Sequence, residues 1–176
     1  MTRARGAQLW AGPLSVALSI TLGVVCAGCR MQEGESTQPD PSPPASSNEH
    51  VLVVHPQAQG EVAPIVRSES EKAGAAGRQL VVYEGATWCE PCQKFHHAVE
   101  HGDLDATFPK LTLLEFDADR DSERLRAAGY SSHYIPLFAL AKADGTSSGK
   151  QVEGGIKGDG AVSYVSDKLK GLLAKN

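Results

Sequence analysis

Apolar and polar residues follow two different patterns along the part of the chain that begins near residue 50. Short continuous apolar runs, such as residues 80–83, are typical of strands buried on both faces. Longer stretches in which apolar residues recur every three or four positions predict amphipathic helices. The pattern predicts strands at 50–54, 80–83, 111–116, 137–141 and 151–153, and helices at 62–78, 90–100, 122–128 and 162–173.

These elements follow one another in the order βαβαβαββα. Such alternation predicts an α/β domain in which a mixed central sheet is flanked by helices. The turn residues agree, since Pro91 suits the first turn of a helix, Gly102 suits a helix end, and Asp144-Gly145 suits a hairpin. We therefore expect one folded domain over residues 50–176.

Residues 1–28 have the composition of a targeting segment. Two arginines precede an apolar stretch at 14–25, and the small residues Ala27 and Gly28 follow it. This order is typical of a secretory signal, and the apolar stretch is shorter than the roughly 20 residues that span a bilayer. Ala27-Gly28-Cys29 resembles a bacterial lipobox, which implies that Cys29 is lipidated. The alternative is an ordinary cleaved signal followed by an incidental Cys29.

Residues 29–49 are rich in Pro, Ser, Gln and Glu and carry few apolar side chains. Such a composition cannot bury enough surface to fold, and its prolines favour extended conformations. The sequence therefore predicts a disordered tether between the anchor and the folded domain.

Charge and cysteine content narrow the possible functions. The chain has 17 basic and 21 acidic side chains, a formal net charge of −4, and no block of Lys and Arg. This argues against nucleic acid or an anionic membrane surface as the main partner. Four cysteines are too few for a disulfide-stapled scaffold, and they fall in two close pairs at 26/29 and 89/92. Two separate pairs indicate two separate chemistries.

The second cysteine pair lies in the motif WCEPC at residues 88–92, between a predicted strand and a predicted helix. Cys89 falls at the helix start, where unpaired backbone N–H groups and the helix dipole favour a thiolate. Cys92 is one turn further on, close enough to form a disulfide with Cys89. Such a pair can attack a substrate disulfide and then release the mixed intermediate, and it needs no cofactor.

Other uses of a cysteine pair compete with redox chemistry. A structural zinc site needs two further soft ligands, and covalent haem needs a histidine directly after Cys92, where Gln93 stands. Copper or zinc delivery through Cys89, Cys92 and His133 stays open, as does a redox-sensing binding protein that uses the same cysteines. The acidic residues at 117–123 lack the spacing of an EF-hand loop and are interpreted as a solvated turn and a helix N-cap.

The WCEPC motif after an apolar strand, with Tyr130 and Ile135-Pro136 further along, resembles the thioredoxin superfamily over about residues 50–174. The resemblance implies a thioredoxin-like fold with Cys89 as the attacking thiolate and Cys92 as the resolving thiol. It also implies a cis bond before Pro136, which with Ile135 and Trp88 would form the substrate groove beside the dithiol. A family glycine after the last hairpin corresponds to Gly154 or Gly155.

The chain also departs from the family pattern. The family keeps a buried aspartate six residues before the first cysteine, as a proton acceptor for the second, and Tyr83 stands at that position. The adjacent Glu84 either replaces it as a catalytic proton shuttle or is exposed without a catalytic part, because neighbouring strand residues face opposite sides. His97 stands where the family has a helix-kinking proline.

We therefore expect an exported, lipid-anchored thiol–disulfide oxidoreductase of a bacterial cell envelope, facing the periplasm or exterior. Its expected partners are protein thiols or disulfides and a membrane electron donor or acceptor, with no nucleic acid, metal or cofactor. The Glu-Pro pair between the cysteines is similar to that of membrane-anchored reductases that keep apocytochrome c thiols reduced, and Glu90 beside a thiolate favours a reductase over an oxidase.

Overall fold

The computed structural model describes residues 49–175. The predicted signal at 1–28, the predicted lipidation site Cys29 and all of the predicted tether except residue 49 lie outside the described residues. Within the described range the elements follow the predicted order, with these bounds: β1 Leu52–Val54, α1 Val62–Ala75, β2 Gln79–Gly85, α2 Glu90–Glu100, β3 Leu111–Asp117, α3 Ala118–Ala127, β4 Leu137–Ala141, β5 Ser147–Glu153 and α4 Ala161–Leu173.

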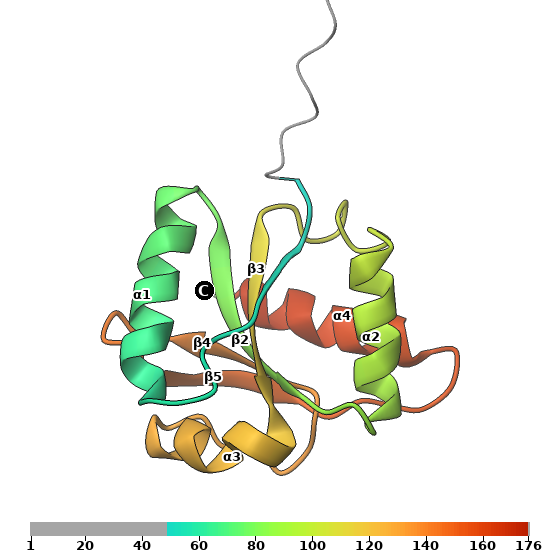
Figure 1. Ribbon diagram of the computed structural model, residues 1–176. Coiled ribbons are helices and arrows are strands. Elements are labelled where there is room, and N and C mark those ends of the chain that lie inside the picture. Colours follow the sequence, from blue (N-terminus) through green and yellow to red (C-terminus); the bar gives the residue numbers. More distant parts are fainter. Residues whose placement is uncertain (1–48, 176) are drawn as a thin grey trace, which may run out of the picture. The chain divides into compact units, whose positions relative to one another are not determined.

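The strands form one mixed sheet in the order β1-β3-β2-β4-β5. Strands β1, β3 and β2 are parallel, whereas β4 runs antiparallel to β2 and β5 runs antiparallel to β4. The sheet lies between α1 on one side and α2 and α4 on the other (Figure 1). The prediction of a mixed central sheet flanked by helices is therefore confirmed.

Each face of the sheet carries its own apolar core, because successive residues of a strand point to opposite faces. In β2, Val81 and Tyr83 belong to the core under α2 and α4, while Val82 belongs to the core under α1 and α3. The residues of both cores are buried, and the side chains of Tyr83 and Val82 are fully inaccessible to solvent. This alternation decides which side of β2 each polar residue near the dithiol can reach.

Several element ends differ from the prediction, among them the start of β1 at Leu52 rather than at residue 50 and the start of β5 at Ser147 rather than at residue 151. The first helix ends at Ala75 rather than Arg78, because the chain turns at Gly77, whose φ of +66° suits glycine. Arg78 then points into the domain, where its Nε donates to Thr112 Oγ1 at 2.9 Å. Strand β2 continues to Gly85, because it pairs with β3 along its whole length.

The third helix begins at Ala118, four residues before the predicted start. Asp117 is its N-cap and accepts hydrogen bonds from the amides of Asp119 and Arg120, so the predicted cap is confirmed. The prediction of a solvated acidic turn is wrong for Asp121, which is fully buried and forms ion pairs with Arg120 and Arg124. A buried carboxylate needs such partners to be tolerated.

Among residues 49–175, no helix combines the length and the apolar character needed to cross a bilayer.

Candidate active site

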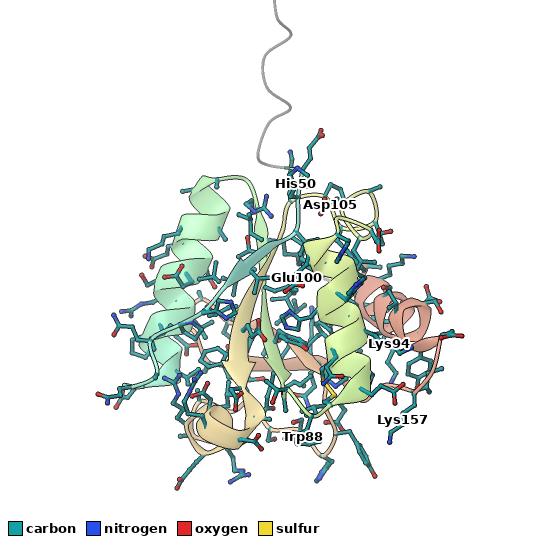
Figure 2. All side chains as sticks on the ribbon, turned by 45° about the vertical axis from the view of Figure 1, so that its right-hand side comes forward. His50, Trp88, Lys94, Glu100, Asp105 and Lys157 are labelled. Atoms are coloured by element: carbon teal, nitrogen blue, oxygen red, sulfur yellow. A yellow bond between two sulfur atoms is a disulfide. The ribbon has the colours of Figure 1, made fainter. Side chains whose placement is uncertain are left out.

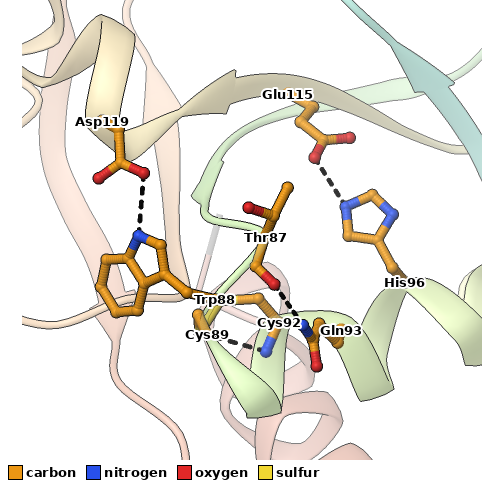
Figure 3. The surroundings of a disulfide bond; sticks show 8 residues. All are labelled: Thr87, Trp88, Cys89, Cys92, Gln93, His96, Glu115 and Asp119. Atoms are coloured by element: carbon orange, nitrogen blue, oxygen red, sulfur yellow. Dashed lines mark hydrogen bonds and ion pairs between the residues drawn. A yellow bond between two sulfur atoms is a disulfide. The ribbon is translucent and has the colours of Figure 1, made fainter.

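The dithiol lies where β2 gives way to α2. Cys89 is the N-cap of α2, with extended backbone angles, and its carbonyl accepts the Gln93 amide at 3.0 Å. The Cys92 amide donates to Cys89 Sγ at 3.3 Å, so the sulfur occupies the place of a capping oxygen (Figure 3). Unpaired N–H groups and the helix dipole at this point favour negative charge on Cys89 when the pair is reduced.

Cys89 and Cys92 form a disulfide with an S–S distance of 2.09 Å and a Cα–Cα distance of 5.2 Å. The structure therefore shows the oxidised state of the pair. Cys89 is 5% exposed and Cys92 is 1% exposed. Cys89 also lines a surface pocket of about 360 Å³, together with Trp88 and Ile135. A partner thiol or disulfide reaches Cys89 from this pocket, which favours Cys89 as the attacking residue.

The predicted Ile135-Pro136 bond lies beside this pocket, since Ile135 is one of the residues that line it. The Ile135-Pro136 peptide bond is cis, as the family resemblance implies. The Pro136 carbonyl accepts the Gly154 amide at 2.9 Å, and a Cβ on Gly155 would lie 2.6 Å from Cβ of Pro91. The segment that follows β5 therefore packs so closely on both prolines that only a glycine fits at position 155 without displacement. Both predicted glycine candidates contribute to this contact.

Aromatic side chains surround the mouth of this pocket. Trp88 is 65% exposed and its Nε1 donates to Asp119 Oδ2 at 2.9 Å, which holds the indole in place (Figure 3). Tyr134, on the other side, is 70% exposed. Figure 2 shows Trp88 at the end of α2 that carries the disulfide, while His50 and Asp105 lie at the far end of the domain. Exposed aromatic side chains are suited to contacting another protein chain.

The structure excludes one of the two alternatives expected for Glu84. It is 4% exposed, so the alternative of an exposed residue is wrong. Its carboxylate oxygens accept hydrogen bonds from Ser122 Oγ at 3.1 Å and Ser132 Oγ at 2.9 Å, and it lines a second pocket beside α3. Within the described residues no hydrogen bond or ion pair joins Glu84 to either cysteine, and its catalytic role stays a prediction.

On the opposite face of β2, His96, Glu115 and Tyr83 form a cluster that is not among the predicted site residues. His96 Nε2 lies 2.7 Å from Glu115 Oε1, and this hydrogen bond raises the pKa of His96 against the opposing effect of burial (Figure 3). The Tyr83 ring lies edge-on to the His96 ring, with 5.5 Å between centroids. Burial and the nearby Glu115 charge raise the pKa of Tyr83, which is therefore a neutral phenol.

Two signals in the sequence could have pointed to this cluster. His96 follows Cys92 by four residues and so shares its helical face. Glu115 is the one charged residue within the predicted strand 111–116.

The alternative of copper or zinc delivery requires a group of side chains that can bind a metal ion. Within residues 49–175, no three His, Cys, Asp or Glu side chains are grouped so that they could hold a metal ion. His133, the proposed third ligand, lines the same pocket as Cys89. Its backbone amide donates to Glu153 Oε2 at 2.9 Å.

A cysteine pair at the start of a helix, packed against Ile135 of a cis Ile135-Pro136 bond beside a mixed sheet, defines a thiol–disulfide oxidoreductase. The chain is 31% identical over 99 residues to "Thioredoxin H-type" of Chlamydomonas reinhardtii, a match that covers 56% of this chain and 75% of that protein. It belongs to the thioredoxin family, has the thioredoxin-like α/β fold, and is a thiol–disulfide oxidoreductase.

Solved thioredoxin structures also align with the chain. A mutant thioredoxin from Halobacterium salinarum aligns with a TM-score of 0.44 and 22% identity, over 74% of this chain and 93% of that one. Thioredoxin O1 from Arabidopsis thaliana in its oxidised state aligns with a TM-score of 0.43 and 21% identity, over 72% and 96%. No protein-family model matches the chain.

Proposed function

We propose that this protein is an exported, membrane-tethered member of the family that reduces disulfides in proteins of the cell envelope. The observation that carries the proposal is the position of Cys89 in a pocket lined by Ile135, whose bond to Pro136 is cis, and by exposed Trp88 and Tyr134. An open, aromatic-lined pocket of this kind accepts an extended protein segment with its sulfur next to Cys89. Relatives of the thioredoxin family act on protein thiols or disulfides in this way.

The reaction needs only the two cysteines. The Cys89 thiolate attacks one sulfur of the substrate disulfide, so that a Cys89–substrate bond forms and one substrate thiol leaves. Cys92 then attacks the Cys89 sulfur, the second substrate thiol leaves, and the Cys89–Cys92 disulfide remains. Two electrons and two protons pass from the dithiol to the substrate. A donor across the membrane would have to reduce the pair again for the next cycle.

Glu90 supports the reductive direction. It lies directly after Cys89, and its Oε1 accepts the Gly158 amide at 2.9 Å, which keeps the carboxylate near the mouth of the pocket. A negative charge close to Cys89 opposes the thiolate and so destabilises the reduced form. A less stable reduced form is a stronger reductant.

The reduction potential of the full-length protein in glutathione and dithiothreitol buffers tests this direction. We expect a value near ~−270 mV or below, whereas a value near ~−120 mV would make the protein a disulfide donor. Glu90→Gln should shift the potential to a less negative value. Glu100→Gln, at the other end of α2, removes the same charge far from the sulfurs and should leave the potential unchanged.

Export and tethering rest on the sequence of residues 1–49, with its signal-like segment and the lipobox-like Ala27-Gly28-Cys29. Expression in a bacterial host with a labelled fatty acid tests them. We expect label and membrane association in the wild type and in Cys26→Ser, and loss of both in Cys29→Ser. Labelled Cys29→Ser protein in the membrane fraction would refute the assignment of the anchor.

A further inference from the structure

The position that carries a proton-accepting aspartate in other thioredoxins is occupied by Tyr83, so the proton of Cys92 needs another acceptor. Tyr83 is fully buried, and its hydroxyl has no hydrogen-bond partner among the described residues. A phenol with a raised pKa can donate a hydrogen bond but does not accept a proton from a thiol. The acceptor therefore has to be found among the groups around Tyr83.

His96 lies on the same face of α2 as Cys92. The two are four residues apart, the spacing at which helical side chains are neighbours. Figure 3 shows His96 on the turn that follows Cys92, with its ring directed toward β3. The Tyr83 ring contacts Phe95 and His96 on α2. The Tyr83 hydroxyl lies so close to Gly85 that a Cβ on Gly85 would overlap it. The Tyr83 hydroxyl thus extends along β2 toward the end of the domain that carries the dithiol.

Glu115 holds the imidazole. It faces Tyr83 across the β2–β3 pairing, and its Oε1 lies 2.7 Å from His96 Nε2. Its other oxygen, Oε2, is buried without a hydrogen bond among the described residues. The imidazole Nδ1 has no partner within residues 49–175 and can take up a proton while Nε2–H donates to the carboxylate.

A route for the proton can begin at Ala86, which belongs to the same buried cluster as Cys92. His96 and Glu115 line a cleft of about 380 Å³ that begins at the loop before the dithiol, at Gly85 and Ala86. The lining of this cleft is mainly apolar, but Gln93, Glu115 and Asp117 contribute polar groups to it. The cleft is large enough for water, which can carry a proton between groups that do not touch. The His96 side chain is 26% exposed, so it has access to this water.

We propose that His96, positioned by Glu115, accepts the proton of Cys92 through the cleft when Cys92 resolves the mixed disulfide. The Cys92 S–H bond breaks, its proton passes through water to His96, and the thiolate attacks the Cys89 sulfur. The substrate thiolate leaves with the electron pair of the broken S–S bond. The imidazolium that forms is paired with the Glu115 carboxylate, and it returns the proton to solvent or to the departing thiolate.

Other charged groups face this pair and set its response to pH. Glu100 lies one turn after His96 on α2 and adds negative charge, and Asp117 of β3 lines the same cleft. On the outer side, His55 Nδ1 lies 3.6 Å from Glu115 Oε2. The surplus of carboxylates favours an imidazolium at position 96 once the proton arrives.

The proposal rests on the dithiol chemistry proposed above, and a rapid-mixing experiment separates the two steps of that chemistry. The reduced full-length protein is mixed with an aromatic disulfide that releases a coloured thiol. Attack by Cys89 releases the first coloured thiol, and resolution by Cys92 releases the second. Both phases are recorded from about pH 5.5 to about pH 9.5 for the wild type and for the variants His96→Gln, Glu115→Gln and His97→Gln.

In His96→Gln we expect an unchanged first phase and a second phase slowed by about 10²-fold near neutral pH, the usual loss for a missing proton acceptor. The second phase should recover as pH rises and Cys92 ionises without help. Glu115→Gln should shift the midpoint of the second phase to lower pH, because His96 loses its carboxylate. His97→Gln is the matched control, since His97 stacks on His101 and does not touch Glu115, and it should behave as wild type.

An unchanged second phase in His96→Gln, with the wild-type pH profile, would overturn the proposal. Equal slowing of both phases would also overturn it, because it would indicate a structural effect. If His96→Gln does not fold, Glu115→Gln decides the question through its pH profile. Absence of the first phase in the wild type would instead refute the oxidoreductase itself, so the two failures are distinguishable.

Discussion

At the scale of single residues, the two buried tyrosines Tyr83 and Tyr130 form a natural comparison. The Tyr83 hydroxyl has no partner among the described residues, whereas the Tyr130 hydroxyl donates to the Gly145 carbonyl at 2.8 Å. An unpaired buried hydroxyl costs about 1–3 kcal/mol, and a satisfied one contributes about 1 kcal/mol. We therefore expect Tyr83→Phe to raise the free energy of unfolding of the oxidised protein or leave it unchanged, and Tyr130→Phe to lower it by about 1 kcal/mol.

Urea unfolding of both variants with the disulfide intact measures the difference. A loss of stability in Tyr83→Phe as large as that in Tyr130→Phe would mean that the Tyr83 hydroxyl has a partner, such as an ordered water in the cleft. Each variant keeps the aromatic ring and loses only the hydroxyl. The ring at position 83 therefore packs on Phe95 and Phe138 in both variants.

A residue can be recognised from the sequence when its role depends on adjacent positions. It cannot be recognised in this way when its role depends on neighbours from other helices or strands. Cys89, Cys92 and Pro136 are each recognisable from a few adjacent positions, and the structure shows the disulfide and the cis bond. The partners of Glu84 and the pairing of His96 with Glu115 depend on strand register and on which helix covers which face. Neither can be deduced from spacing along one chain segment.

At the scale of elements, the His96–Glu115 pair joins α2 to β3 and makes stability depend on pH. The hydrogen bond to Glu115 raises the pKa of His96 in the folded protein. A raised pKa means that the folded state binds the proton more tightly, so the pair contributes full stability below about pH 6.5, the ordinary histidine value. This contribution is lost as pH rises through the raised pKa of the folded state.

Chemical unfolding of the wild type and His96→Gln at a series of pH values tests this link. The stability difference between them should be largest at about pH 6 and should shrink above that value. His97→Gln leaves the pair intact and should follow the wild type throughout. A difference between wild type and His96→Gln that stays constant across this range would show that the two elements are joined by packing and not by the ion pair.

The sequence predicts which segments are helices and which are strands. It predicts less accurately where each element begins and ends. The apolar runs identify β2, β3 and β4 because these strands are buried on both faces. The start of α3 at Ala118 depends on capping by Asp117, one of several acidic residues in a run that also contains the buried Asp121. A carboxylate that is paired in the folded state looks like any solvated one in the sequence.

At the scale of the whole molecule, the order βαβαβαββα predicts the layers. The pairing of β4 with β2 brings the cis-proline just before β4 to the same end of the sheet as the dithiol after β2. Two segments far apart in the sequence thus form one surface. The exposed rings of Trp88 and Tyr134 belong to this surface. A folded protein substrate contacts more of this surface than a small disulfide reagent does.

We therefore expect Trp88→Ala and Tyr134→Ala to discriminate between substrates by size. Loss of an aromatic contact residue costs about 1–2 kcal/mol of binding, so kcat/KM for a protein disulfide should fall roughly 5- to 30-fold. For a small aromatic disulfide kcat/KM should change little, because Cys89 and its helix are untouched. Tyr164→Ala is the matched control, since Tyr164 is also exposed but lies on α4 and does not line the pocket. Equal losses for both substrates would show that the rings support the dithiol itself, whereas a loss confined to the protein substrate would identify them as part of the surface that recognises it.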